Sequence, residues 1–187
     1  MASSAPDALT PRAREIVAAA LEILEADGRD GLTMRRIAAR LGIRAPSLYK
    51  HFPDKGALTA ALISAAFAEQ AELFERAVED SAEPLADLAA EYRRYAHAHP
   101  HLYRLMTDQE LRRDLLVPGI EDRAGHPIFV AAGSDRDRAR AAWAFAHGMT
   151  MLELTNRFPP GADIDAAWDA GIAAFGAPAK AAPPGVR

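Results

Sequence analysis

Hydrophobic side chains recur every three to four positions along most of this chain, which is the period of amphipathic helices. The first such pattern spans residues 11–28, where Thr10 and Pro11 form a helix-start signal and Gly28 a stop signal. Its apolar face comprises Ile16, Val17, Ala20, Leu21 and Leu24. We expect this helix to cover the back of the segment that follows it.

Residues 32–55 contain two short helical patterns that a glycine separates. Thr33 stands where the N-cap of the first helix belongs, and Gly42 follows its last apolar residue, where a left-handed conformation costs glycine little. The apolar positions of this helix are Leu32, Ile37, Ala38 and Leu41. Two short helices joined by a tight turn are typical of a helix-turn-helix unit.

The second helix of this unit is predicted from Pro46 to Phe52. Proline suits the first turn because its φ angle is already helical, and Pro53 ends the helix. Leu48 and Phe52 are four residues apart, so both can pack on the first helix. The side chains left for the exposed face are Ser47, Tyr49, Lys50 and His51. Asp54 can cap the helix that Lys55 opens.

Further helical patterns cover most of the remaining chain. We expect helices over residues 55–77, 84–99, 101–106, 109–116, 135–156 and 163–175. The buried candidates of the 55–77 helix are Leu58, Leu62, Ala65, Leu73 and Phe74. Pro118-Gly119 and Gly125-His126-Pro127 punctuate a region without a clear element. No strand pattern is convincing, so the predicted fold is all-α, with disordered tails over residues 1–8 and 177–187.

Charge is unevenly distributed along the sequence. The net charge of −4 by itself disfavours nucleic-acid binding. Residues 33–55 nevertheless hold six cationic side chains against Asp54 alone, a net of +5 that leaves −9 on the rest of the chain. An isolated charge run is usually a solvated helix face. On a helix-turn-helix, the same patch favours phosphate binding.

The same segment resembles a known DNA-binding signature. The matching positions are Thr33, Ile37, Ala38, Leu41-Gly42-Ile43, Ser47 to Phe52, and Lys55. They resemble the TetR family of bacterial transcription regulators, and the resemblance extends from about Pro11 to about Leu62. It implies an N-terminal three-helix head over residues 9–55 that binds double-stranded DNA, with the second helix of the unit in the major groove.

The helix-turn-helix binding mode assigns roles to individual side chains. The candidates for reading bases are Arg35, Arg44, Ser47 and Lys50, and the candidates for holding phosphates are Thr33, Tyr49, His51 and Lys55. Ala45 and Pro46, at the start of the recognition helix, complete the expected DNA-binding set.

The second half of the chain carries a weaker resemblance. The run from His99 to Met106, followed by Trp143 and by His147-Gly148, resembles a TetR subgroup with a Trp…His-Gly motif. The resemblance implies a helical effector-binding and dimerisation domain over residues 56–176. Its ligand-binding candidates are Tyr103, Met106, His126, Phe129, Trp143 and His147, although aromatic and Met stripes at helical spacing are more often plain core.

The 135–156 helix is apolar on nearly every side, which indicates that nearly every side is covered. The face expected to meet a second copy of the chain comprises His147, Gly148, Met151 and Leu154. A central core helix in a monomer is the alternative interpretation. Together with the 163–175 helix, a homodimer formed through a four-helix bundle is favoured.

Several other classes of protein lack support in the sequence. The chain has no cysteine, and Pro100 interrupts the helical spacing that a metal pair among His97, His99 and His101 would need, so no metal or cofactor is expected. No catalytic triad, phosphate loop or HExxH pattern is present, so an enzyme is not expected. No apolar run approaches a membrane span, and no signal peptide is evident, so we expect a cytoplasmic protein with no membrane partner.

These observations lead to one main hypothesis. It describes an all-α, homodimeric transcriptional regulator, a repressor that a small and mostly apolar effector releases from a palindromic operator. Tyr103, His126 or His147 would orient the effector. A regulator without a small-molecule effector is one alternative. An enzyme or ligand carrier that retains a vestigial helix-turn-helix is the alternative from another class.

Overall fold

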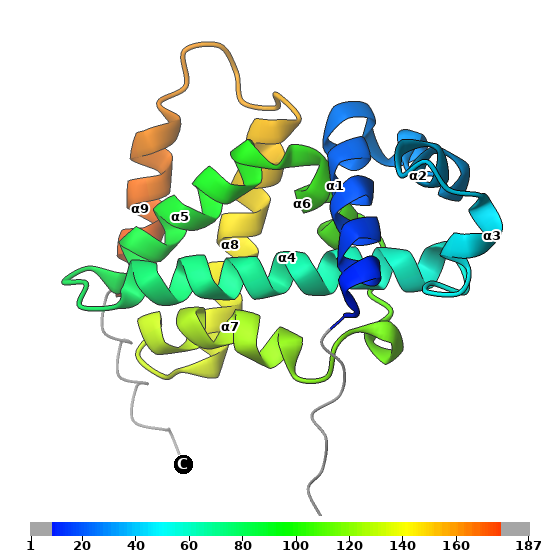
Figure 1. The fold of residues 1–187 in the computed structure, drawn as a ribbon. Coiled ribbons are helices and arrows are strands. Elements are labelled where there is room, and N and C mark those ends of the chain that lie inside the picture. Colours follow the sequence, from blue (N-terminus) through cyan, green and yellow to red (C-terminus); the bar gives the residue numbers. More distant parts are fainter. Residues whose placement is uncertain (1–8, 177–187) are drawn as a thin grey trace, which may run out of the picture. The chain divides into compact units, whose positions relative to one another are not determined.

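The computed structural model describes residues 9–176, and the predicted disordered tails lie outside these residues. Within them the chain is all-α, with helices and no strand, so the predicted fold class is confirmed (Figure 1). The helices are α1 (Pro11–Gly31), α2 (Met34–Arg40), α3 (Ala45–Leu48), α4 (Lys55–Val78), α5 (Pro84–Ala98), α6 (Pro100–Thr107), the 3-10 helix η1 (Arg113–Leu115), α7 (Ile120–Ala131), α8 (Arg136–Leu154) and α9 (Ile164–Gly176).

The helices pack into two compact units. Unit 1 contains the described residues up to Leu73 together with Arg94–Gly125, and unit 2 contains Phe74–Arg93 and the described residues from His126 onward. Helices α4, α5 and α7 each contribute residues to both units. Unit 1 therefore holds α1, α2 and α3 with α6 and most of α4. The domain limits of 9–55 and 56–176 stay a prediction from the sequence.

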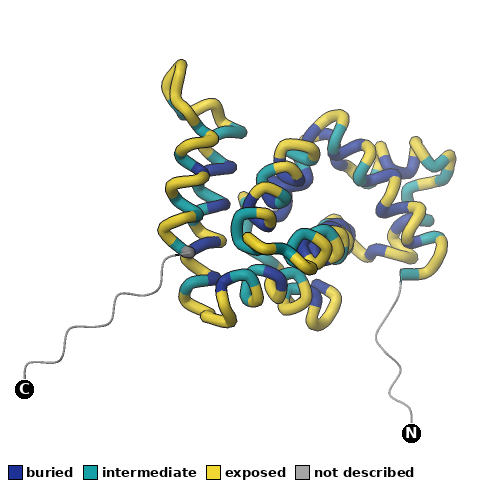
Figure 2. Tube along the Cα trace, turned by 90° about the vertical axis from the view of Figure 1, so that its left-hand side faces the viewer, coloured by how far each residue is buried: buried dark blue, intermediate teal, exposed yellow. Residues whose placement is uncertain are grey.

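The core of unit 1 joins the first four helices. Its fully buried side chains include Ile16, Ala20, Leu24, Leu32, Ile37, Leu48 and Leu58. The predicted caps are present: Thr10 Oγ1 accepts from the Ala13 N–H at 3.2 Å, and Thr33 Oγ1 from the Arg36 N–H at 3.3 Å. Figure 2 shows buried and exposed residues alternating around these helices, as the amphipathic pattern predicts.

Helix α6 packs on the last turns of α1 within unit 1. Glu25 Oε1 on α1 accepts from the Leu102 N–H in the first turn of α6 at 3.2 Å. Gly28 has a φ of 69° and interrupts the helical geometry of α1. A side chain there would be strained, and its Cβ would lie 3.3 Å from the His101 ring. Gly28 thus allows both the kink and the close approach of α6.

Helices α8 and α9 pack closely in unit 2. The Phe145 ring of α8 meets Trp168 of α9 edge-on, with 5.5 Å between ring centroids. A Cβ placed on Gly171 would come within 2.0 Å of the Phe145 ring, so this contact requires glycine as the structure stands. The sequence pattern does not single out Gly171, because its partner is distant in the sequence.

Helix α4 resembles a membrane span by length and composition alone. Among the described residues it is the one helix that is long and apolar enough, but half of its most apolar window is buried inside the protein. Burial of Leu58, Leu62 and Phe74 is the behaviour of a core helix. Ala65 was expected to be buried and is exposed, because its neighbours Ser64 and Ala66 occupy the inner face instead.

One predicted helix is wrong, and one region left without a predicted element is helical. Residues 109–116 form only the short helix η1. The Gln109 side-chain amide donates to the Leu105 carbonyl at 3.0 Å. Arg112 pairs with Asp114, and side chains two positions apart would not face each other on an α-helix. The region of residues 118–127 belongs largely to α7, which contains both Gly125 and Pro127. The ring of Pro127 is fully buried, so packing offsets the helix-breaking tendency.

Candidate nucleic-acid interface

The turn between α2 and α3 fixes which side chains face outward. Gly42 adopts the predicted left-handed conformation, with a φ of 64°. Helix α3 spans four residues rather than the predicted Pro46–Phe52, and the chain continues as a turn in which the N–H groups of His51 and Phe52 both donate to the Leu48 carbonyl at 2.9 Å. Leu48 and Phe52 are buried, so the residues between them are left at the surface.

All ten sequence-predicted DNA-binding residues belong to unit 1, and none of them is buried. The exposed residues are Thr33, Arg35, Arg44, Pro46, Tyr49, Lys50, His51 and Lys55, and the half-buried residues are Ala45 and Ser47. Tyr49 keeps 50% of its surface exposed, so its side chain is accessible to a partner. These placements make the ten residues available, while their roles stay a prediction.

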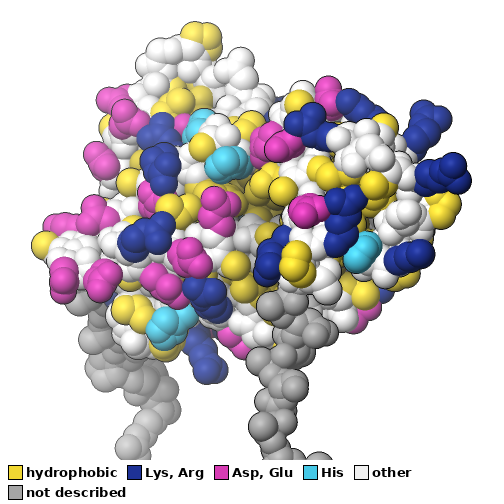
Figure 3. Space-filling model, in the orientation of Figure 1, with side chains coloured by type: hydrophobic (Ala, Val, Ile, Leu, Met, Phe, Trp, Pro, Cys, Tyr) yellow, Lys and Arg dark blue, Asp and Glu magenta, His cyan; other side chains and the backbone are white. Residues whose placement is uncertain are grey.

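The arginines of α2 divide into two groups. Arg36 pairs with Asp27, and Arg40 pairs with Glu22, so both guanidinium groups are engaged by carboxylates of α1. Within residues 9–176, no carboxylate lies within ion-pair distance of Arg35, Arg44, Lys50 or Lys55. Figure 3 shows Lys and Arg side chains gathered over α2 and α3. We call Arg35, Arg44, Lys50 and Lys55 the free-cation set.

The internal pairs of Arg36 and Arg40 were not found from the sequence. Their partners on α1 are nine and 18 positions away, so local spacing gives no signal for them. Asp54 behaves as predicted and accepts from the Ala57 N–H at 2.8 Å, which fixes the start of α4 beside Lys55. Four of the six cations counted in the sequence therefore remain for an anionic partner.

The six predicted ligand-binding residues are divided between the two units. Tyr103 and Met106 are buried in unit 1. His126 is exposed on α7, and its ring lies 6.5 Å from that of Phe129. Trp143 is 52% exposed on α8, where its ring stacks on His147 with 6.2 Å between centroids. Two of the six candidates thus belong to unit 1 and four to unit 2, and the ligand-binding role stays a prediction.

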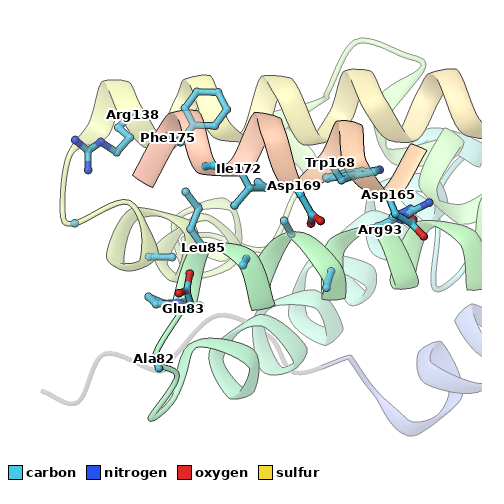
Figure 4. Close-up of a pocket in the computed structure, with 17 residues that line it drawn as sticks. Ala82, Glu83, Leu85, Arg93, Arg138, Asp165, Trp168, Asp169, Ile172 and Phe175 are labelled. Carbon is cyan, nitrogen blue, oxygen red and sulfur yellow. The ribbon is translucent and has the colours of Figure 1, made fainter. Parts of the chain in front are cut away.

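Unit 2 contains an open groove of about 670 Å³ between α5 and α9, here called the α5–α9 groove. In Figure 4, Ile172 and Asp169 of α9 point toward α5, and Leu85 points back from α5. None of the six predicted ligand-binding residues lines this groove.

A polar network at one end of the α5–α9 groove ties three helices together. Arg93 of α5 donates to Glu153 Oε2 of α8 at 2.8 Å and to Asp165 Oδ1 of α9 at 2.6 Å. The Trp168 indole N–H donates to Glu153 Oε1 at 2.6 Å. Burial by itself lowers the pKa of Arg93, but the hydrogen bonds to Asp165 and Glu153 outweigh it and raise the pKa. No pattern in the sequence predicted this network.

The predicted dimer face lies along α8. His147, Gly148, Met151 and Leu154 are all half-buried in the single chain. A Cβ on Gly148 would meet nothing within 4 Å among the described residues, so nothing within this chain requires glycine there. Two large apolar side chains of the same helix, Trp143 and Leu152, are 52% and 43% exposed. They are nine positions apart and therefore lie on opposite sides of α8, and of the two only Trp143 lies on the same side as His147 and Met151.

Two family models match the sequence. One, described as bacterial regulatory proteins of the tetR family, covers residues 16–62, and the other, described as a tetracyclin repressor-like C-terminal domain, covers residues 85–175. The chain is 32% identical to an uncharacterized HTH-type transcriptional regulator of Mycobacterium tuberculosis, over 75% of this chain and 69% of that protein.

Solved structures share the whole fold. A protein of unknown function from Rhodococcus sp. RHA1 is 27% identical with a TM-score of 0.74, covering 92% of this chain and 97% of that one. A TetR variant from Acinetobacter baumannii AYE, solved in complex with minocycline, is 26% identical with a TM-score of 0.59, covering 86% of this chain and 91% of that one.

Proposed function

This chain belongs to the TetR family of bacterial regulatory proteins, and from that premise we propose that it is a homodimeric repressor with a palindromic operator and a small-molecule effector. A DNA-binding transcriptional regulator is the function that the family gives it. The observation that carries the DNA-binding mechanism is the free-cation set, which has no carboxylate within ion-pair distance in the described chain, whereas Arg36 and Arg40 of α2 pair with carboxylates of α1.

In this mechanism α3 enters the major groove. Arg44 and Lys50 flank the helix at its two ends, and together with Arg35 and Ser47 they read base edges. Thr33, Tyr49, His51 and Lys55 hold phosphates on either side of the groove, and Ala45 and Pro46 allow close approach of the backbone. Burial of Leu48 and Phe52 supports this assignment, because it prevents α3 from turning its polar face inward.

The homodimer forms through α8 and α9. Exposure of Trp143, whose ring stacks on His147 of the predicted face, and the open space over Gly148 support this proposal. Close packing of Gly171 against Phe145 holds α8 and α9 together as one surface that can meet its copy in a four-helix bundle. A two-fold protein reads two-fold DNA, so the operator is a palindrome.

The effector binds outside the helix-turn-helix head and is mostly apolar. The minocycline complex of a related structure and the match to a tetracyclin repressor-like C-terminal domain support an effector, without naming it. Tyr103, Met106, His126, Phe129, Trp143 and His147 stay our predicted contacts. The stacked pair of Trp143 and His147, next to Gly148, supports assignment to the Trp…His-Gly subgroup.

Release of DNA follows from a change in the separation of the two heads. Helix α4 is one continuous helix of 24 residues that begins at Lys55 and ends in unit 2, so it can carry a displacement to the phosphate-binding end. An effector shifts the equilibrium only if it prefers the spacing that no longer fits the operator. Helix α4 is thus the proposed link between effector and DNA.

Genome-wide mapping of bound DNA tests the proposal, because the genes beside the bound sites suggest effectors. A true effector raises the melting temperature of the free protein and lowers its affinity for the mapped operator, since the two equilibria are linked. If the operator is bound but every suggested molecule leaves both quantities unchanged, the regulator without an effector is the better account. If no sequence is enriched, the DNA-binding proposal itself fails.

A further inference from the structure

A second hollow lies in unit 1, at the end of α4 that carries Lys55. It measures about 300 Å³, the lower limit of typical small-molecule sites, and we call it the α4–α6 pocket. Its lining comprises Arg29, Lys55, Gly56, Thr59, Ala60, Ile63, Leu105, Gln109, Glu110, Leu111, Arg112 and Leu116. None of the residues predicted to bind the effector is among them.

The α4–α6 pocket has an apolar floor and a charged rim. Ala60, Ile63, Leu105 and Leu116 are buried, whereas the four charged lining residues Arg29, Lys55, Glu110 and Arg112 are exposed. Such a division suits an amphipathic ligand, whose apolar body covers the floor while its polar head stays at the rim.

The charges of the rim favour an anion. Arg112 is engaged by Asp114 through two hydrogen bonds of 2.9 and 2.7 Å, so this pair is close to neutral. Arg29 donates to the neutral Gln109 amide at 2.6 Å, and within the described part of the chain Lys55 has no carboxylate partner. Among the cationic lining residues, Arg29 and Lys55 are thus the two that have no carboxylate within ion-pair distance in the described chain, and they are the groups that a ligand carboxylate would contact.

We propose that the α4–α6 pocket binds a small monocarboxylate with an apolar tail, and that its carboxylate on Arg29 and Lys55 competes with DNA phosphate. The binding half of this inference stands independently, and the competition half rests on the proposed role of Lys55 as a phosphate contact. Because one ammonium group cannot serve both anions fully, ligand and DNA bind antagonistically through a shared residue rather than through a movement of the heads.

Methyl NMR of the isotope-labelled full chain, titrated with octanoate, tests the binding half. Ile63 lies in the floor of the α4–α6 pocket and Ile172 lines the α5–α9 groove, so their methyl signals report on the two hollows separately. Octanoate should shift the Ile63 signal saturably and leave Ile172 unmoved. A shift of Ile172 alone, or no saturable shift of Ile63, overturns the inference.

Charge specificity is tested with octylamine and with three variants. Octylamine, which has the same tail and the opposite charge, should not shift Ile63. Arg29→Gln and Lys55→Gln should each weaken octanoate binding about tenfold, the loss typical of one charge-assisted hydrogen bond. Arg14→Gln is the matched control, because Arg14 is exposed on α1 and does not line the pocket. Equal binding of octylamine, or equal affinity in all variants, contradicts an anion site.

Competition with DNA is measured separately, by titrating octanoate into a complex of the wild-type protein with its operator. The apparent operator affinity should fall over the octanoate concentrations that saturate the Ile63 shift. If octanoate shifts the Ile63 signal but leaves the operator affinity unchanged, the proposed competition with DNA is wrong. Failure to bind any operator before octanoate is added refutes the proposed function instead, and the NMR result on the free protein still decides the pocket.

Discussion

The hydroxyl of Thr150 is fully buried on α8, and its Oγ1 has no hydrogen-bond partner among the described residues. A buried polar group without a partner costs about 1–3 kcal/mol. Thr150→Val keeps the shape and removes this cost, so it should raise the free energy of unfolding by about 1 kcal/mol. Thr107→Val is the matched control, because the Thr107 hydroxyl donates to the Tyr103 carbonyl at 2.9 Å. Thr107→Val should lower the free energy of unfolding, because it removes this hydrogen bond. If urea unfolding shows changes of the same sign for both variants, the Thr150 hydroxyl is not an unsatisfied group.

The residues that we propose as phosphate contacts should affect all DNA sequences alike. Lys55→Ala and Tyr49→Phe remove groups assigned to phosphates, which carry no base information. Each should weaken binding to operator and to unrelated duplex by a similar factor. Lys55→Ala should also reduce the slope of log affinity against log salt by about one. Fluorescence anisotropy over a series of salt concentrations measures both effects, and a loss confined to the operator would assign Lys55 to base reading.

Local signals predicted the conformation of several residues correctly. Thr10, Thr33 and Asp54 are caps and Gly42 is left-handed, because each of these roles depends on a neighbour within four positions. Ion pairs between elements had no such signal. Arg36 therefore counted as a DNA-facing charge in the sequence, although Asp27 of α1 engages it.

At the scale of elements, two glycines in helices have opposite roles. A Cβ added to Gly125 in α7 would meet nothing within 4 Å in the described chain, so Gly125→Ala should stabilise the protein by about 1 kcal/mol through helix propensity. Gly171→Ala brings the same gain, but it forces the Phe145 ring away from α9 and should cost about 1–3 kcal/mol overall. Urea unfolding at fixed protein concentration measures both, and stabilisation by Gly171→Ala would refute the close packing.

The start of α8 should be sensitive to acid. Asp135 accepts from the Asp137 and Arg138 N–H groups at 2.9 and 3.0 Å, and these backbone hydrogen bonds lower its pKa. Because the pKa of Asp135 is lower in the folded state, its charged cap stabilises the fold fully above the pKa of Asp in the unfolded chain, about 4. This stabilisation is lost as the pH falls below that value. The melting-temperature difference between wild type and Asp135→Ala should therefore be largest near neutral pH and shrink toward pH 3. An unchanged difference would mean that the carboxylate charge is irrelevant to the cap.

Element prediction succeeded where hydrophobic periodicity was strong and failed where breakers dominated. Helices α4, α5, α8 and α9 begin and end within a few residues of their predicted limits. Helix α7 was missed because Gly125 and Pro127 are helix-breaking on average, whereas burial of Ile120 and Pro127 decides the local outcome. A burial pattern of this kind depends on residues distant in sequence, which periodicity does not include.

At the scale of the whole molecule, assembly is the feature most open to test. Gly148→Arg places a charged side chain on the proposed four-helix bundle, where burying it without a partner is costly. Because nothing within the described chain lies over Gly148, the monomer itself should tolerate the change. Sedimentation should show a dimer for wild type and a folded monomer for the variant. A monomeric wild type at micromolar concentration would exclude the α8–α9 interface.

The helix-turn-helix has a local signature in the sequence, whereas the hollows described in the two units have none. Residues 33–55 carry a dense local signature, and the structure exposes every one of the ten residues predicted from it at least partly. The six ligand-binding candidates were chosen by residue type, and none of them lines the α5–α9 groove or the α4–α6 pocket. Cavities form between elements, so their linings, such as Arg93, Trp168 and Ile172 in the α5–α9 groove, have no local signature.

Selection from random double-stranded DNA by the purified wild-type protein, with Arg44→Ala and Lys50→Ala selected in parallel, tests whether α3 reads the bases of a two-fold operator. We expect a palindromic motif for the wild type, with half-sites about one helical turn or more apart. Each variant should change the preferred bases at symmetric positions. No enriched motif for the wild type, or an identical motif for all three proteins, would contradict the assignment of α3 as the recognition helix.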